Sequence, residues 1–207
     1  MSAWPFDPLR PLSYGVIVAD PPWHYVLRSE AGYGKSPEAH YQTMALPEIQ
    51  SLPVGHLAGG DCLLVMWSTW AHLEQALATM RAWGFTYKTG GSWTKRYRSG
   101  KAAFGTGYVF RSATEPYLLG TIGAPKLRSK SERNLIETDV DEAFPSSIEA
   151  LRREHSRKPM EMRDVVDRFC PDVFGVELFA REPWPGRDVW GLETDRFNPA
   201  ETSEAAA

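Results

Sequence analysis

An unbroken apolar run that ends in an acidic, proline-containing turn constrains the fold of this chain more than any other feature. Residues 14–19 are rich in valine and isoleucine, and Asp20-Pro21-Pro22-Trp23 follows them directly. A short continuous apolar run is typical of a strand that is buried on both faces of a sheet. Because each proline disfavours helical geometry at the residue before it, the chain is expected to leave this strand in a stiff, extended turn.

The remainder of the chain alternates between strand and helix patterns. Apolar runs predict strands at residues 62–67, 85–93, 117–122, 134–138, 173–180 and 188–192. Helical spacing predicts a helix at 70–83, which Thr69 can cap and Gly84 ends, and another that opens at Pro159. Strands that alternate with helices predict an α/β fold with a doubly wound, mostly parallel sheet.

The length and the apolar runs bound the organisation of the chain. Its 207 residues suffice for one α/β domain, so we expect an extended arm at 1–13, a single domain at 14–194 and a flexible tail at 195–207. The longest apolar runs are too short to cross a bilayer and no secretory signal pattern is present, so we expect a cytoplasmic protein without a membrane partner. Cys62 and Cys170 form neither a disulfide framework nor a metal-ligand spacing, so no metal site is predicted.

Charge is distributed unevenly along the chain. Residues 88–133 contain ten lysines and arginines but two acidic residues, a net charge of +8, whereas the whole chain carries −3. The basic residues gather in an insert at about 94–107 and 124–133, where aromatic residues stand among them. Cations for phosphates and aromatic rings for unstacked bases are typical of a nucleic-acid surface. This pattern predicts nucleic-acid contacts at Lys95, Arg96, Arg98, Lys101 and Arg111; the alternative is a solvated basic loop.

The turn at Asp20 brings together groups that suit a planar base with an exocyclic amine. In an open α/β sheet, ligands bind beyond the carboxyl ends of the strands, where Asp20 stands. The Asp20 carboxylate and a free Pro21 carbonyl can accept hydrogen bonds from the amine, and the Trp23 indole can stack on the base. Two fixed acceptors would aim the amine lone pair at an electrophile, with Asp20 available to accept a proton. The candidate catalytic residues are Asp20, Pro21, Pro22 and Trp23; the alternative is a structural strand-exit turn.

Many short motifs in a fixed order make the chain resemble the MT-A70 family of adenine-N6 methyltransferases over about residues 14–193. Each motif alone is weak, and their common order makes the resemblance specific. They are Ala19-Asp20-Pro21-Pro22-Trp23, His40-Tyr41-Gln42-Thr43-Met44, Leu64-Val65-Met66-Trp67, Ala82-Trp83-Gly84-Phe85, Trp93-Thr94-Lys95, Gly105-Thr106-Gly107, Arg111 with Glu115, Leu119-Gly120, His155-Ser156-Arg157-Lys158-Pro159, Glu177-Leu178-Phe179-Ala180-Arg181, Pro185-Gly186 and Trp190-Gly191.

The resemblance implies a Rossmann-like methyltransferase fold with permuted motif order and S-adenosylmethionine as cofactor. Lys158 is expected near the cofactor carboxylate, and Glu177 at the ribose hydroxyls, with Arg181 paired to Glu177 or reaching the ribose. Leu192 and Pro183-Trp184 stand where family members often carry polar residues. The implied cofactor-binding residues are Ala19, Asp20, Lys158, Glu177, Phe179, Arg181 and Glu193.

The resemblance also bears on the substrate. The implied polymer is DNA rather than RNA, because the short single-domain form resembles bacterial and phage members, and the host compartment would be the cytoplasm of a bacterial or phage-infected cell. Tyr41 lies in a stretch that resembles a mobile loop over the base, and Glu115 joins the implied substrate-binding residues, while the basic insert is expected on the same side as the catalytic turn. The alternatives are an RNA adenine-N6 methyltransferase, a non-catalytic nucleic-acid-binding paralogue, and a protein or small-molecule acceptor, which the basic segment argues against. The family resemblance also allows a homodimer or a heterodimer.

Overall fold

The computed structural model describes residues 4–24, 43–97, 99–105, 109–140 and 158–194. Tyr41 and Arg98, two of the predicted substrate-binding residues, lie outside this part of the chain, as does the predicted tail.

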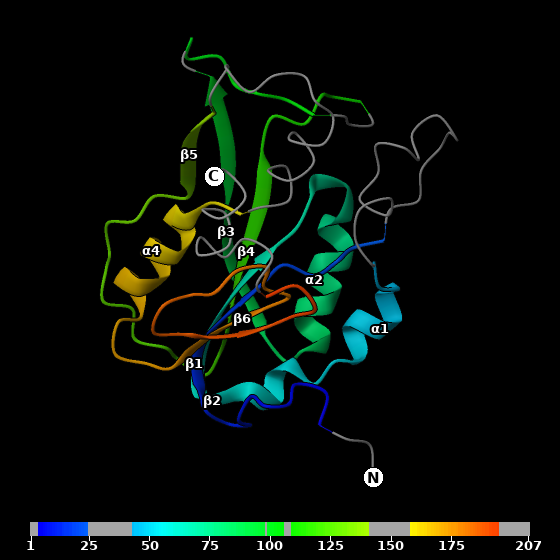
Figure 1. Cartoon of the computed structure of the whole chain (residues 1–207), viewed down its shortest axis with the longest axis vertical. Coiled ribbons are helices and arrows are strands. Elements are labelled where there is room, and N and C mark those ends of the chain that lie inside the picture. The colour runs from blue at the N-terminus through cyan, green and yellow to red at the C-terminus, as the bar shows by residue number, and fades with distance from the viewer. Residues whose placement is uncertain (1–3, 25–42, 98, 106–108, 141–157, 195–207) are drawn as a thin grey trace, which may run out of the picture.

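Within the described residues, seven strands form one sheet in the order β5-β3-β4-β2-β1-β6-β7. β4 runs antiparallel to its neighbours β2 and β3, and every other pair of neighbours is parallel. The predicted α/β fold with a mostly parallel sheet is therefore confirmed (Figure 1). The strands are β1 (Tyr14–Ala19), β2 (Ala58–Trp67), β3 (Thr86–Tyr97), β4 (Glu115–Ile122), β5 (Leu135–Val140), β6 (Gly175–Leu178) and β7 (Asp188–Trp190).

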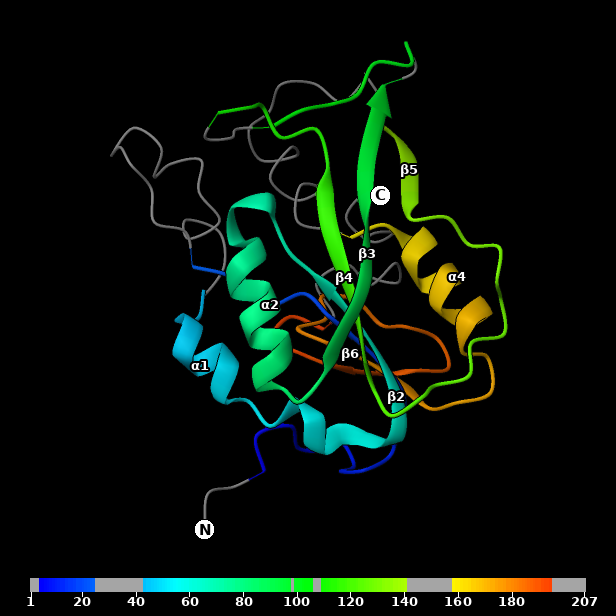
Figure 2. The same ribbon diagram turned by 180° about the vertical axis from the view of Figure 1, so that it is seen from behind.

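Helices cover both faces of this sheet. Figure 1 shows α4 (Met160–Phe169) on one side and α1 (Leu46–Ser51) with α2 (Leu73–Ala82) on the other, and Figure 2 shows the same division from behind. Side chains alternate along β1, because Ile17 packs with the α1 and α2 residues while Val16 and Val18 pack with those of α4. The two faces of the sheet therefore support two separate apolar cores.

The helices follow the predicted patterns closely. Ala76 and Met80 of α2 are buried, and Gly84 ends the helix with a left-handed φ of 86°. Residues 70–72, predicted as the first turn of this helix, form the separate 3-10 turn η4 (Trp70–His72), and a second such turn, η3 (Val54–Leu57), precedes β2. Helix α4 begins one residue after Pro159, and its buried face includes the predicted Met162 together with an unpredicted Arg163.

The last strands are shorter than predicted. β6 spans Gly175–Leu178 because Phe179 adopts a left-handed φ of 62° that turns the chain out of the sheet. The N-terminal segment also differs from an extended arm, since Phe6 is fully buried and contacts Trp190 with a ring-centroid distance of 5.0 Å. Phe6 and Leu9 thus belong to the apolar core on the α1 and α2 face of the sheet, and the Leu12 and Ser13 N–H groups donate to the carbonyl oxygens of His56 and Leu57.

The basic insert is divided by the fold into two distant parts. Residues 94–97 belong to β3, and the following loop continues from its carboxyl end. Because β4 is antiparallel, it carries the chain back to the start of β2, where Ile122 pairs with Cys62 and the Ala124 N–H donates to Asp61. Residues 124–133 therefore begin at the amino end of β2, whereas Asp20 lies at the carboxyl end of β1. The start of this second part therefore lies away from Asp20, and the chain then returns to Asn134, whose carbonyl oxygen accepts from the Ser92 N–H of β3.

The residues in the described ranges bear on two kinds of partner, membranes and metal ions. No helix in these ranges has the length and apolar character needed to span a membrane. In the same part of the chain, no group of three or more histidine, cysteine, aspartate and glutamate residues could hold a metal ion.

Candidate active site

The carboxyl ends of three parallel strands meet at one cleft. Ala19 of β1 lies beside Met66 of β2 on one side and Leu178 of β6 on the other, so the three strands end at the same level. Asp20 follows β1 directly and lies between the ends of β2 and β6. Ligands bind beyond the carboxyl ends of the strands in sheets of this kind. A cleft lies there, lined by Val18, Asp20, Trp67, Lys158, Pro159, Met162, Arg163, Glu177, Phe179, Arg181 and Glu182.

One lysine joins the catalytic turn to β4. Lys158 Nζ lies 3.3 Å from Asp20 Oδ2 and 3.2 Å from Glu115 Oε2, with its charge 5.6 Å from the ring centre of Trp67. Glu115 reaches this cluster because β4 starts where β2 ends, as the antiparallel register of Tyr117 with Trp67 requires. Glu115, predicted among the substrate-binding residues, therefore lies beside Asp20, at the centre of the site.

The Asp20 carboxyl has an unusual proton affinity in this setting. Burial raises the pKa of Asp20, the charge and hydrogen bond of Lys158 lower it, and the negative charge of Glu115 raises it. The net direction is upward, so the carboxylate holds a proton more readily than an exposed aspartate does. A carboxylate of this kind is suited to accept a proton during a reaction.

The turn after Asp20 is held by its own hydrogen bonds. The Trp23 backbone N–H donates to the Pro21 carbonyl oxygen at 2.8 Å, and the Met44 N–H donates to the Pro22 carbonyl oxygen at 3.0 Å. The expectation of a free Pro21 carbonyl is therefore wrong, because the tight turn folds the next amide back onto it. A carbonyl oxygen has two lone pairs, so Pro21 keeps one, on a residue that is buried and is not among those that line the cleft.

Trp23 is packed more tightly than the sequence suggested. It is 5% exposed, its indole Nε1–H donates to the Trp67 carbonyl oxygen at 3.3 Å, and its ring stacks on His72 with centroids 6.0 Å apart. The predicted open stacking face is thus not what the structure presents, because the indole completes the apolar core that covers this side of β1.

His72 is a neighbour of the catalytic turn that sequence reasoning missed. Its Nε2 lies 3.2 Å from the His24 carbonyl oxygen, which can only accept, so Nε2 carries the hydrogen. Its Nδ1 then accepts from the Thr69 hydroxyl at 2.9 Å. Burial lowers the pKa of His72, in keeping with this neutral form. The only signal in the sequence was its place just after the strand that ends at Trp67.

The carboxylate of Glu177 is neutralised by an arginine of α4. Glu177 Oε2 accepts from Arg163 Nε at 2.9 Å and from Arg163 Nη2 at 2.6 Å. Arg181, considered from the sequence as the partner of Glu177, pairs instead with Glu193 at 3.0 Å. Phe179 lies between Glu177 and Arg181 in the chain. Its left-handed φ turns the chain out of the sheet, so that Arg181 lies toward Glu193 and not toward Glu177.

The cleft excludes one residue that the resemblance implied and includes another that no motif indicated. Ala19, implied as a cofactor residue, is fully buried and is not among the residues that line the cleft. Arg163 lines it, although no motif indicated it. A signal was present, because Arg163 lies one turn before Val166 on the predicted buried face of α4, where a cation needs a buried anion.

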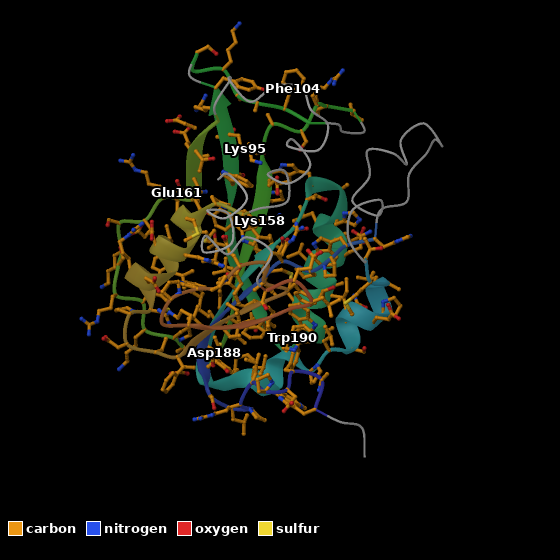
Figure 3. The ribbon with its side chains drawn as sticks, in the orientation of Figure 1. Lys95, Phe104, Lys158, Glu161, Asp188 and Trp190 are labelled. Atoms are coloured by element: carbon orange, nitrogen blue, oxygen red, sulfur yellow. The ribbon has the colours of Figure 1, made fainter. Side chains whose placement is uncertain are left out.

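The predicted nucleic-acid residues lie on the part of the molecule beyond this cleft. Figure 3 shows Lys95 and Phe104 outward of Lys158, on β3 and the loop that follows it. Lys95 lies over the Trp93 ring, and Arg111 lies over the Phe104 ring with its guanidinium 5.5 Å from the centroid. Lys101 is exposed. Arg96 differs from the others, because it binds Glu137 at 2.5 Å and the Gly100 carbonyl oxygen at 3.1 Å.

Comparison with known proteins identifies the family. The MT-A70 family model matches residues 14–193, nearly the whole chain. The chain belongs to the MT-A70 family. This confirms the resemblance read from the motifs and, with it, the methyltransferase class and the Rossmann-like fold.

The relatives of this MT-A70 chain differ greatly in length. The Type II methyltransferase M.MunI of a Mycoplasma species is 31% identical over 206 residues, covering 91% of this chain and 81% of M.MunI. The N(6)-adenosine-methyltransferase MT-A70-like protein of Arabidopsis thaliana is 31% identical over 82% of this chain, which spans 22% of that protein. The human N(6)-adenine-specific methyltransferase METTL4 is 29% identical over 89% of this chain, which spans 38% of that protein.

The donor set of the cleft fits the cofactor that methyltransferases of this family imply. S-adenosylmethionine carries a carboxylate, a sulfonium, two ribose hydroxyls and an adenine. The cleft offers the cations Lys158 and Arg181, the carboxylates Asp20 and Glu177, and the Phe179 ring. Arg163 occupies Oε2 of Glu177 twice, so Oε1 is the oxygen left to accept from a hydroxyl. Cations for the carboxylate and anions for hydroxyls and sulfonium are thus all present in one cleft.

Proposed function

We propose that this protein transfers a methyl group from S-adenosylmethionine to the exocyclic N6 amine of adenine in DNA. The observation that carries the proposal is the position of Asp20, held on a hydrogen-bonded turn at the mouth of a cleft that suits the cofactor. Membership of the MT-A70 family supports the adenine-N6 chemistry.

Asp20 and Pro21 would position the amine. An adenine amine has two hydrogens, and the Asp20 carboxylate with the remaining lone pair of the Pro21 carbonyl supplies two acceptors. These bonds draw the nitrogen lone pair out of the ring and aim it into the cleft. The bound cofactor supplies the methyl group on a sulfonium that leaves as a neutral thioether. Asp20, whose pKa is raised by burial, accepts the proton that the amine loses as its new bond to carbon forms.

Lys158 would have two duties in this reaction. Its contact with Asp20 favours the ionised carboxylate, which is the form that accepts the amine hydrogens. Its position in the cleft also suits the cofactor carboxylate, as the family resemblance implies. Glu115 shares Lys158 and thereby holds the ammonium close to Asp20 in the structure described here.

Trp23 would support the base site from within the core. Because Trp23 is nearly buried and bound to the end of β2, it fixes the turn that carries Asp20. A base that enters beside the turn would meet His72, which is partly exposed and stacks on Trp23. Tyr41, in the resemblance a residue of a loop over the base, lies outside the described residues.

The choice of DNA rests on the pattern of relatives. M.MunI, named a Type II methyltransferase, matches this chain over most of both proteins, whereas the relatives named adenosine methyltransferases are several times longer than the matched part. The resemblance associates the bacterial members of the family with DNA. We propose that Lys95, Lys101 and Arg111, with Arg98, bind the phosphates beside the cleft.

The test is mass spectrometry of adenine methylation. The protein is incubated with S-adenosylmethionine and with single- and double-stranded DNA and RNA of matched sequence, and N6-methyladenine is quantified. We expect methylation of DNA by the wild type and none by Asp20→Ala. Methylation of RNA alone would overturn the DNA assignment, and binding of DNA without methylation of any polymer would favour a non-catalytic paralogue.

A further inference from the structure

Arg163 is a buried cation that lines the cleft, and it belongs to none of the motifs that carry the family resemblance. It is 6% exposed and reaches from α4 to the chain segment that follows β6. Besides its two bonds to Glu177, Nη1 donates to the Pro183 carbonyl oxygen at 2.9 Å and Nη2 to the Glu182 carbonyl oxygen at 3.3 Å. Its guanidinium carbon also lies 5.2 Å from the ring centre of Trp184. One side chain therefore ties α4, β6 and the segment after Phe179 together.

The charge of Arg163 has a specific counterpart in Glu177. Burial raises the pKa of Glu177, the charge and hydrogen bonds of Arg163 lower it, and the nearby carboxylates Asp20 and Glu182 raise it. Three carboxylates thus line one cleft, and Arg163 is the cation in direct contact with Glu177 and within 3.8 Å of Glu182. Without that cation, an ionised Glu177 would be buried beside two like charges.

The geometry of the pair leaves one oxygen for a ligand. Both bonds from Arg163 end on Oε2 of Glu177, so that oxygen is held against the guanidinium. Oε1 is the remaining acceptor, on a residue that lines the cleft. A carboxylate oxygen is a strong acceptor for a hydroxyl hydrogen.

We propose that Arg163 is a positioning residue for cofactor recognition, acting through Glu177 on a ribose hydroxyl of S-adenosylmethionine. Arg163 keeps Glu177 ionised and oriented, and it holds in place the segment that carries Arg181. The inference rests on the proposed function for the identity of the ligand. It adds a residue and a physical role that the family motifs do not contain. A purely structural ion pair is the competing explanation.

A cycle of protein and ligand changes separates the two explanations. Calorimetry measures the affinity of the protein for S-adenosylhomocysteine and for its 2′-deoxy and 3′-deoxy analogues. For the wild type, we expect loss of one hydroxyl to weaken binding about 10- to 100-fold, as for a hydrogen bond to a charged group. In Arg163→Met, which keeps the length of the side chain and removes its charge, we expect the same analogue to bind within about threefold of S-adenosylhomocysteine. Arg163→Lys should restore part of the discrimination.

Arg187 provides a matched control. It is also a largely buried arginine that lies over Trp184, at 5.7 Å, but it pairs with Asp167 and is not among the residues that line the cleft. Arg187→Met should lower the melting temperature and leave the discrimination against the deoxy analogue intact. If Arg163→Met does not fold, Glu177→Gln takes its place in the cycle and should show the same loss of discrimination.

The outcomes are distinct. If Arg163→Met weakens binding of all three ligands by the same factor, the pair is structural and the proposal is overturned. A wild type that binds S-adenosylhomocysteine and methylates adenine, yet binds both deoxy analogues equally well, also overturns it while leaving the proposed function standing. A wild type with no affinity for S-adenosylhomocysteine contradicts the proposed function and this inference together.

Discussion

Asp20→Asn should separate the stability of this protein from its activity. The substitution keeps the size and shape of the side chain and removes the negative charge at the mouth of the cleft. Asp20 is partly buried, with 26% of its side chain exposed, and its pKa is raised by burial against the opposing effect of Lys158. The negative charge of Asp20, which the reaction requires, therefore lowers the free energy of unfolding.

The expected loss of activity follows from the two duties of the carboxylate. A hydrogen bond to a charged acceptor contributes about 1.5–3 kcal/mol, which alone corresponds to about 10- to 150-fold in rate if it is made in the transition state. Loss of the proton acceptor adds a factor of about 100 or more. Asp20→Asn should therefore lower the rate of methyl transfer by at least about 100-fold, while S-adenosylhomocysteine still binds.

Asp20→Asn is expected to stabilise the folded protein at neutral pH. When a carboxyl group has a higher pKa in the folded state than in the unfolded state, the free energy of unfolding falls as the pH rises from the unfolded pKa through the folded pKa. At neutral pH, removal of the charge should thus raise the free energy of unfolding. The lost contact with Lys158 offsets about 0–1 kcal/mol of this, because Lys158 is partly exposed and keeps Glu115. The difference between variant and wild type should vanish in acid, where Asp20 is protonated.

Two measurements check this reasoning. Transfer of a labelled methyl group to an adenine-containing oligonucleotide reports activity, and thermal unfolding between acid and neutral pH reports stability. Asp172→Asn, which changes an exposed aspartate that pairs with Arg128, serves as the control and should alter neither. The reasoning is refuted if Asp20→Asn retains more than about a tenth of the activity. It is equally refuted if the variant melts more than about 4 °C below the wild type at neutral pH, a loss of about 1 kcal/mol or more.

Two further predictions concern the neighbours of Asp20 and the basic surface. Glu115→Gln removes a charge that raises the pKa of Asp20, so the acid limb of the pH profile of kcat should move to lower pH; an unmoved limb would mean that Asp20 is not the titrating group. Replacement of Lys101 and Arg111 by Ala should weaken duplex binding and reduce the slope of log affinity against log salt by about 1.8. The control is Arg128→Ala, in the segment that begins at the amino end of β2, and it should leave the slope unchanged. Equal effects of the two changes would place the nucleic acid elsewhere.

Local patterns predicted the elements of this fold well, and their failures have physical causes. The alternation that buries Ile17 on one face and Val16 on the other is a property of any strand, so β1 was readable from its residues alone. The end of β6 was not, because the left-handed φ of Phe179 is held by its surroundings and leaves no mark on the sequence. The direction of β4 was equally hidden, since an apolar strand reads the same whether it runs parallel or antiparallel to its neighbours.

The candidate site shows the same division. Asp20 was found because a strand, an acid and two prolines follow each other in the chain, and covalent order forces them together. Glu177 was recognised as a buried carboxylate that needs a partner, but sequence spacing offered Arg181, four residues on, and the structure supplies Arg163 from α4. A residue that is distant in the chain becomes a partner only through packing, which the local pattern does not contain.

Residue order along the chain was sufficient to predict the class of fold, the turn at Asp20 and the family, because these depend on residue types in a fixed sequence. The tertiary structure decided which charges meet: Lys158 with Asp20 and Glu115, and Arg163 with Glu177. It also divided the basic insert, since the antiparallel β4 carries the chain to the start of β2 before residues 124–133 begin. Electrostatic contacts act over a few ångströms through space, so their partners are settled by how the strands and helices pack and not by their separation in sequence.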